Sequence, residues 1–128
     1  MNYLLDTHLL LWAASDPARL PASVRQIIEA PDNELYFSTA CIWEVVIKRS
    51  LKRADFSVDA NIFRRGLLDS SYIELPIQGQ HALAVAGLPN IHRDPFDRIQ
   101  IAQARADGMV FVTSDETLKA YGDPVRQF

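Results

Sequence analysis

The fold follows from the stretch YLLDTHLLLWAAS at residues 3–15. Its first part, Tyr3–Leu5, is short and apolar, which predicts a buried β-strand with Asp6 and Thr7 at its carboxyl end. Residues 8–15 are apolar and long enough for a helix, and Asp16-Pro17 ends it because the residue before a proline avoids helical backbone angles. The chain therefore begins with a strand that leads into a helix, with an acid at the junction.

The same alternation of short strands and helices continues along the chain. Further strands are expected at residues 35–38, 72–75, 109–112 and, as a short edge strand, 125–128. Helices are expected at residues 21–30, 39–51, 61–70, 79–88, 95–107 and 115–121, with Thr39 and Asp94 as caps and an extended linker from Asp55. This order is typical of an α/β/α sandwich, in which helices cover both faces of a central, mostly parallel sheet of four or five short strands.

The composition is that of an ordinary globular protein, with 48% apolar and 23% charged residues. The length of 128 residues predicts one domain, residues 1–128. The longest apolar runs are far shorter than the roughly 20 residues that span a bilayer, and no signal peptide is expected. The single cysteine, Cys41, excludes an internal disulfide and a cysteine-based zinc site, so the expected compartment is the cytoplasm.

Four acidic residues are expected to gather at one edge of the sheet. Asp6 and Asp115 follow predicted strands, whereas Glu44 and Asp97 lie near the starts of helices that leave the same edge. Carboxylates without neutralising bases repel one another, so such a cluster typically holds a hard divalent cation such as Mg²⁺. A bound metal could lower the pKa of a water and orient it for in-line attack on a phosphodiester. The sequence therefore predicts a metal-dependent hydrolase.

Each acid also has a purely structural explanation. Asp6 could be a turn residue that accepts backbone hydrogen bonds, and Asp115 could cap the last helix. Glu44 could pair with Lys48 one helical turn later, an interaction worth only about 0.3 kcal/mol on a surface. Asp94 and Asp97 could both complement a helix dipole; we prefer an N-cap role for Asp94 and retain Asp97 as the candidate site residue.

Other side chains give weaker signs of chemistry. The histidines His8, His81 and His92 lack metal-ligand spacing, and no nucleotide-binding or serine-nucleophile motif occurs. Trp12 and Trp43 are expected to serve packing rather than nucleobase stacking. Basic residues cluster within residues 48–53, at 64–65 and within 93–105, where they form either a solvated helix face or a guide for a phosphate backbone.

Four segments, in order along the chain, carry a resemblance to a known family. They are Tyr3–His8, Ser38–Lys48, His92–Ala104 and Val112–Asp115. Together they resemble the PIN-domain ribonucleases, specifically the VapC-type toxins of bacterial toxin–antitoxin pairs. The resemblance maps the catalytic and metal-binding acids of that family onto Asp6, Glu44, Asp97 and Asp115.

The resemblance implies an endoribonuclease, dependent on Mg²⁺ or Mn²⁺, that cuts cellular RNA such as tRNA or ribosomal RNA. It also implies a homodimer and a VapB-like antitoxin that silences the enzyme. We expect the antitoxin to supply a basic residue, because the acidic pocket is expected to contain none, and to lie on apolar surface formed by Leu9, Leu10, Trp12, Trp43 and Ile47. The alternatives are a housekeeping PIN nuclease without an antitoxin and a non-enzymatic PIN-fold interaction module.

Overall fold

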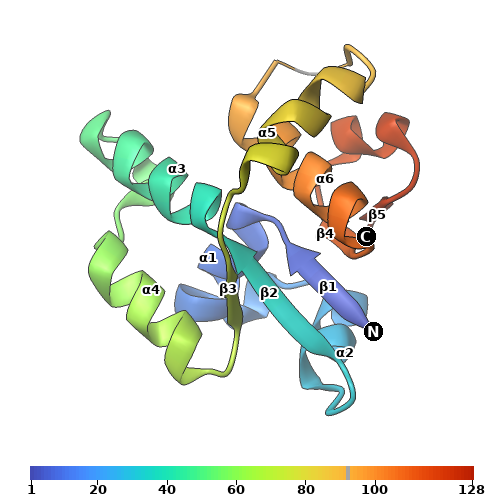
Figure 1. The fold of residues 1–128 in the computed structure, drawn as a ribbon. Helices are drawn as coiled ribbons and strands as arrows, with labels where there is room; N and C mark the ends of the chain where they lie inside the picture. Colours follow the sequence, from blue (N-terminus) through green and yellow to red (C-terminus); the bar gives the residue numbers. More distant parts are fainter. Residues whose placement is uncertain (92) are drawn as a thin grey trace.

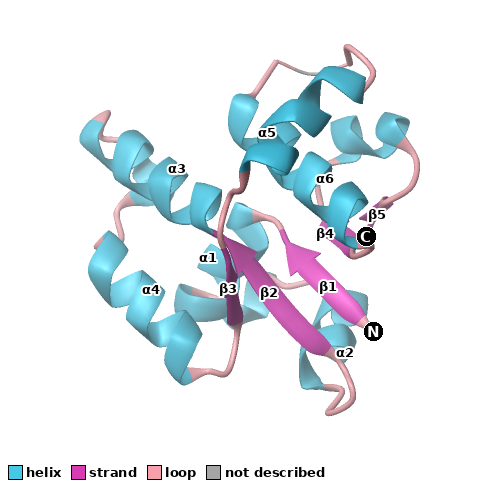
Figure 2. Cartoon of the chain, in the orientation of Figure 1, coloured by secondary structure: helices cyan, strands magenta, loops and turns pink. Residues whose placement is uncertain are grey.

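A parallel β-sheet forms the centre of the described chain (Figures 1 and 2). The computed structural model describes residues 1–91 and 93–128, so His92, the first residue of the third motif segment, lies outside the described residues. Five strands are present in the described part: β1 Asn2–Leu5, β2 Glu34–Ser38, β3 Ile73–Leu75, β4 Val110–Thr113 and β5 Val125–Gln127. Their order is β3-β2-β1-β4-β5, and every neighbouring pair is parallel.

Helices cover both faces of this sheet, which confirms the predicted α/β/α sandwich. The α-helices are α1 Thr7–Ser15, α2 Ala22–Glu29, α3 Thr39–Ser50, α4 Ala60–Asp69, α5 Gly79–Ala84 and α6 Pro95–Asp107. Short 3₁₀ segments are η1 Pro17–Arg19, η2 Ala54–Phe56, η3 Val85–Gly87 and η4 Glu116–Tyr121. Figure 1 shows α1, α2 and α4 on one side of the strands and α5 and α6 on the other. Among the described helices, none has the length and apolar character needed to cross a membrane.

The alternation of side chains along β1 divides the core into two halves. Tyr3 and Leu5 pack with buried residues of α1, α2, α3 and α4. Leu4, between them, points to the opposite face and packs with α6 and η4. All three side chains are buried, so β1 is a central strand covered on both faces, as its apolar sequence predicts.

The sheet is extended first on one side of β1 and then on the other. The chain places β2 and then β3 on one side of β1, and β4 and β5 on the other. The backbone N–H of Asp6 donates to the carbonyl of Val112 at 2.9 Å and extends the β1–β4 pairing by one residue. The carboxyl ends of β1 and β4 therefore meet at the switch point, the place where sheets of this type bind ligands.

Four local predictions differ from the structure. Ser38, rather than Thr39, caps α3, because its Oγ accepts a hydrogen bond from the Ala40 N–H at 3.0 Å. Thr39 is already the first helical residue, and its Oγ1 accepts from the Ile77 N–H. The segment at Asp55 is not an extended linker but the 3₁₀ turn η2, because Phe56 is buried in the core. The helix expected at 79–88 is divided into α5 and η3, and the last helix is 3₁₀.

The apolar surface predicted for a partner is only partly correct. Leu9 and Leu10 are fully buried in the core, because α1 packs directly against the sheet. Trp43 and Ile47 do lie at the surface, with 58% and 38% of their area exposed. The buried residues of α3 are Ala40, Cys41, Glu44 and Val45, which recur at the three- and four-residue spacing of one helix face, and exposed Trp43 lies outside that face.

Candidate active site

One pocket, of about 380 Å³, contains all four of the predicted site acids. It opens at the carboxyl ends of β1 and β4, between α3 and the N-terminus of α6. Its lining residues are Asp6, His8, Trp12, Glu44, Lys48, Arg53, Asp94, Asp97, Ser114 and Asp115. The structure thus brings together acids from four separate segments, and it adds three basic side chains that were not expected there.

Asp6 is fixed at the base of the pocket by three hydrogen bonds. Its Oδ1 accepts from the backbone N–H groups of His8 at 2.8 Å and Leu9 at 3.2 Å, which caps α1. Its Oδ2 accepts from the Thr113 hydroxyl at 2.5 Å. Burial raises the pKa of Asp6, although these hydrogen bonds and the nearby His8 oppose the shift. Asp6 therefore has the cap role considered for it, and it is also a buried carboxylate in the pocket.

Glu44 is held from two sides. Its Oε1 accepts from the Thr7 hydroxyl at 2.6 Å, and Thr7 Oγ1 accepts from the Gln100 amide at 3.3 Å. Its Oε2 accepts from the Lys48 ammonium at 2.5 Å. The residue is only 2% exposed, so this pair with Lys48 lies inside the protein rather than on a solvated helix face.

The expectation that the pocket contains no basic residue is wrong, because Lys48 lines it. Its Nζ also lies 3.5 Å from Asp94 Oδ2, and the side chain is 15% exposed. The ammonium is 5.0 Å from the ring centroid of Phe56 and 5.8 Å from that of Phe96. Burial disfavours the charged form, but the hydrogen bond and charge of Glu44, with the charges of Asp94 and Asp97, raise the pKa of Lys48 overall. Lys48 is thus a charged, partly desolvated ammonium among carboxylates.

Asp94 and Asp97 both lie at the first turn of α6. Asp94 caps this helix, since its Oδ1 accepts from the Phe96 N–H at 2.9 Å, and Pro95 occupies the first helical position, as predicted. Its other oxygen faces Lys48. Asp97 is partly buried in the same pocket. The N-cap role of Asp94 is therefore correct but incomplete, because this residue lines the pocket as well.

Asp115 is positioned at the opposite wall by the start of η4. Its Oδ1 accepts from the backbone N–H of Thr117 at 2.9 Å and from the Thr117 hydroxyl at 2.7 Å. Its own N–H donates to Thr113 Oγ1 at 3.0 Å. Thr113 therefore connects Asp115 to Asp6, and the cap role of Asp115 coexists with its place in the pocket.

The donor set of the pocket fits a hard divalent cation. It offers carboxylate oxygens from Asp6, Glu44, Asp97 and Asp115, the ligand type that Mg²⁺ and Mn²⁺ prefer. As the side chains stand, no three His, Cys, Asp or Glu residues of the described chain form a ready metal site, and Lys48 occupies one oxygen of Glu44. A cation in this pocket would offset the cost of ionising buried Asp6.

Three polar residues that position the acids were not singled out from the sequence. They are Thr7, Gln100 and Thr113, each fully or almost fully buried. The available signal was a polar residue within a buried apolar segment, as for Gln100 between Ile99 and Ile101. Within the described chain, Oε1 of Gln100 has no hydrogen-bond partner, so its place is determined by the two bonds that its amide nitrogen donates.

Proteins similar to this chain share its sequence pattern and its fold. A family model described as "PIN domain" matches residues 3–124. Ribonuclease VapC22 of Mycobacterium tuberculosis is 27% identical over 121 residues, which are 94% of this chain and 92% of that protein. Among solved structures, VapBC2 from Rickettsia felis bound to a promoter DNA fragment has a TM-score of 0.72 at 15% identity, covering 100% of this chain and 98% of the other.

Two further solved structures have the same fold. DNA-bound VapBC from Salmonella typhimurium gives a TM-score of 0.70 at 16% identity, with 100% and 97% of the two chains covered. A toxin–antitoxin complex from Klebsiella pneumoniae gives 0.62 at 20% identity, with 98% and 96% covered. At these identities the structures show the fold alone. The family match, which spans most of the sequence, confirms the PIN-domain resemblance, and the chain belongs to the PIN domain family.

Proposed function

We propose that this chain is an endoribonuclease toxin of the VapC type, dependent on Mg²⁺ or Mn²⁺ and silenced by a cognate antitoxin. The observation that carries the proposal is the meeting of Asp6, Glu44, Asp97 and Asp115 in one pocket at the switch point of the sheet. Membership of the PIN domain family and similarity to a protein named as a ribonuclease support it.

The proposed metal ligands are these four acids, directly or through water. A bound divalent metal would lower the pKa of a coordinated water and neutralise the negative charge that develops on the leaving oxygen. The protein fixes the ligands beforehand: the first turn of α1 and Thr113 hold Asp6, whereas Thr7 orients Glu44. Such fixed carboxylates lose little conformational freedom when the cation and RNA bind.

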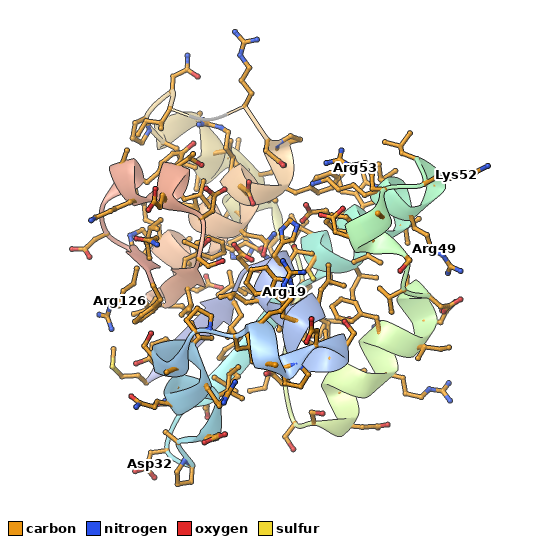
Figure 3. All side chains as sticks on the ribbon, turned by 180° about the vertical axis from the view of Figure 1, so that it is seen from behind. Arg19, Asp32, Arg49, Lys52, Arg53 and Arg126 are labelled. Atoms are coloured by element: carbon orange, nitrogen blue, oxygen red, sulfur yellow. The ribbon has the colours of Figure 1, made fainter. Side chains whose placement is uncertain are left out.

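Basic residues at the rim of the pocket are suited to an RNA backbone. Figure 3 shows Arg49 and Lys52 extending away from α3, whereas Arg53 lies on the side that faces α6. Arg53 and His8 both line the pocket, and His8 Nε2 is 3.0 Å from Asp55 Oδ2. Arg53 places positive charge beside the acids, where the phosphates of a bound RNA strand would pass.

An exposed apolar surface beside the pocket supports the proposed antitoxin. A mainly apolar groove of about 460 Å³, which we name the apolar groove, is lined by Trp43, Ile77, Ala82, Val85, Pro95, Phe96 and Ile99, with Arg93 and Arg98 among its lining residues. Trp43 and Phe96 meet edge to face, with ring centroids 5.2 Å apart. An antitoxin segment in this groove would end next to the acids and could block RNA entry, and one of the similar structures is a toxin–antitoxin complex from Klebsiella pneumoniae. A homodimer and action in the cytoplasm, where RNA and antitoxin are made, complete the proposal.

The test is RNA cleavage by purified wild-type protein and by Asp97→Asn, in Mg²⁺ and in EDTA. Asp32→Asn is the matched control, because Asp32 is exposed in a turn far from the pocket (Figure 3) and undergoes the same loss of charge. We expect cleavage by the wild type and Asp32→Asn in Mg²⁺ only, and none by Asp97→Asn. Equal cleavage by Asp97→Asn would contradict the proposed site.

Growth and partner binding distinguish a toxin from a housekeeping PIN nuclease. Overproduction of the wild type should arrest growth, and co-production of a small DNA-binding protein encoded next to it should restore growth and give a stable complex of low nuclease activity. RNA cleavage without growth arrest or partner would favour the housekeeping enzyme. Absence of cleavage with the acids intact would favour a non-enzymatic interaction module.

A further inference from the structure

We propose that Lys48 is an internal counter-ion that competes with the divalent metal for Glu44 and moves to Asp94 when metal binds. This inference rests on the proposed function, because it takes the pocket to be a metal site. Lys48 is the residue of α3 one turn after Glu44, so the metal ligand and its competitor are attached to the same helix. Lys48 would act as a positioning residue, since it acts through Glu44.

The contact between Lys48 and Glu44 differs from an ordinary surface ion pair. The side chains are only 15% and 3% exposed, and the Nζ to Oε2 distance is 2.5 Å. The other oxygen of Glu44 already accepts from Thr7 at 2.6 Å. A divalent cation that uses Glu44 must therefore approach a carboxylate whose outer oxygen holds an ammonium, and two positive charges a few ångströms apart repel strongly in a partly buried site.

A second position for the ammonium is built into the same pocket. Nζ already lies 3.5 Å from Asp94 Oδ2, and Asp94 is held in place because its Oδ1 caps α6. The rings of Phe56 and Phe96 flank the ammonium at 5.0 and 5.8 Å, within the range of cation–π attraction. A small rotation of the lysine side chain would transfer the ammonium from Glu44 to Asp94 without exposing it to bulk water.

This arrangement assigns separate roles to the two neighbouring acids of α6. Asp97 is a proposed metal ligand, whereas Asp94 would be the receiving carboxylate for Lys48. In the metal-free protein, the ammonium would neutralise part of the charge among the acids and lower their mutual repulsion. In the metal-bound protein, the ammonium would leave Glu44 free to bind the cation. Metal affinity would therefore depend on how strongly Asp94 attracts Lys48.

The primary test compares Lys48→Met with Arg49→Met by titration calorimetry with Mn²⁺. Methionine keeps the apolar stem of the lysine. Arg49 is the adjacent residue and pairs with exposed Asp59 at 3.2 Å, so its substitution removes the same charge outside the pocket. We expect Lys48→Met to bind Mn²⁺ roughly tenfold more tightly or better, since a nearby like charge is removed. Arg49→Met should remain within about twofold of wild type at about 0.15 M salt, where remote charges are screened.

A second arm tests the role of Asp94. Asparagine keeps an oxygen for the helix cap but removes the charge that would receive Lys48. Asp94→Asn should weaken Mn²⁺ binding several-fold in the presence of Lys48, but should have little effect in the Lys48→Met background. Such non-additivity is the expected sign of two residues that act together. Equal effects in both backgrounds would contradict the transfer to Asp94.

A third measurement follows the metal-free fold by thermal denaturation in EDTA. Lys48→Met should have a lower midpoint than wild type, because a buried carboxylate loses its partner, and should gain more from added Mn²⁺. If Lys48→Met does not fold, Lys48→Gln keeps a donor for Glu44 without the charge and takes its place in the titration.

The outcomes separate this inference from the proposed function. Wild-type protein that binds Mn²⁺ and cleaves RNA, with unchanged or weaker Mn²⁺ binding in Lys48→Met, would overturn the counter-ion role alone. No Mn²⁺ binding by either protein, together with no RNA cleavage, would overturn both proposals. Mn²⁺ binding by Lys48→Met but not by wild type would support the counter-ion role in its strongest form.

Discussion

Single residues in this protein combine a structural role with a place in the acidic pocket. Asp6 caps α1 through Oδ1 and accepts from Thr113 through Oδ2, yet it also lies in the acidic pocket. Asp115 caps η4 in the same way. A cap fixes the direction of a carboxylate at no further entropic cost, which is useful for a residue that must meet a ligand. The sequence leaves open whether Asp6 and Asp115 are helix caps or site residues. The structure shows that one residue can be a cap and also line the pocket.

The first prediction concerns Asp6→Asn in the absence of metal. Because burial raises the pKa of Asp6, the folded state keeps a proton over a pH range in which the unfolded chain has released it. This residue therefore favours folding below its ordinary pKa, and its contribution is lost as the pH rises through the raised pKa. Asparagine retains the acceptor for the His8 and Leu9 amides and removes the ionisation.

We thus expect Asp6→Asn in EDTA to gain stability relative to wild type as the pH rises from about 4 to 7. Urea denaturation of both proteins across this range measures the difference, in which the effects of all other ionisable groups cancel. If Asp6→Asn instead loses stability relative to wild type as the pH rises, the Thr113 hydrogen bond lowers the pKa of Asp6 by more than burial raises it. In either case Asp6→Asn should not cleave RNA.

The second prediction separates the two acids of α6. Asp94→Ala removes the acceptor for the Phe96 N–H and should cost about 1 kcal/mol of stability, as loss of an N-cap does. Its RNA cleavage should recover at high Mg²⁺ concentration. Asp97→Ala should remain stable but inactive at any Mg²⁺ concentration. Denaturation midpoints and cleavage rates of both variants test this, and equal inactivity at high Mg²⁺ would mean that Asp94 is itself a ligand.

At the scale of elements, α3 brings both an acid and a base to the acidic pocket. Its inward face carries Glu44, its next turn carries Lys48, and its outward face carries Trp43. The start of the helix is held by Ser38, whose Oγ accepts from Ala40 N–H and donates to Gln103 Oε1 of α6 at 2.5 Å. The cap of α3 is thereby tied to the helix that carries Asp97, on the other side of the pocket.

The third prediction tests this connection. Ser38→Ala removes the cap and leaves buried Gln103 without its hydroxyl donor, so it should cost roughly 1–3 kcal/mol of stability. Thr39→Ala, at the neighbouring position, loses only one exposed contact to the Ile77 N–H and should cost less than about 1 kcal/mol. Chemical denaturation of the two variants checks the order. A larger loss for Thr39→Ala would contradict the assignment of Ser38 as the cap.

At the scale of the whole molecule, the acidic pocket and the apolar groove lie next to each other. They share the boundary formed by α3 and the start of α6, where Trp43 contacts Phe96. Trp43 is 58% exposed, which is unusual for so large an apolar side chain. This combination suits a partner that binds through apolar residues and ends over the acids.

The fourth prediction concerns that partner. Trp43→Ser should weaken binding of the antitoxin at least roughly tenfold, because exposed aromatic anchors dominate such interfaces, while RNA cleavage by the free protein persists. Ile62→Ser is the control, since Ile62 is 70% exposed on α4, away from the pocket. Calorimetric titration of both variants with the antitoxin measures the effect. Equal affinities would show that the antitoxin binds elsewhere.

The sequence by itself determined the alternation of strands and helices, because strands and helices leave local periodic signals and short, doubly buried strands read as apolar runs. It also indicated Asp6, Glu44, Asp97 and Asp115 as the acids that meet, because parallel strands bring their carboxyl ends to one edge. The cap at Asp94 followed from its neighbour Pro95. Each of these inferences needs only residues close together in the chain or the topology of the sheet.

Only the tertiary structure decided which groups surround those acids. The bonds from Thr7 to Glu44, from Gln100 to Thr7 and from Thr113 to Asp6 join residues 37, 93 and 107 positions apart. The burial of Leu9 and the exposure of Trp43 depend on which helix faces meet the sheet. Whether Lys48 pairs with Glu44 in water or inside a pocket depends on the packing of α6 and η2 around it, and no local pattern encodes that packing.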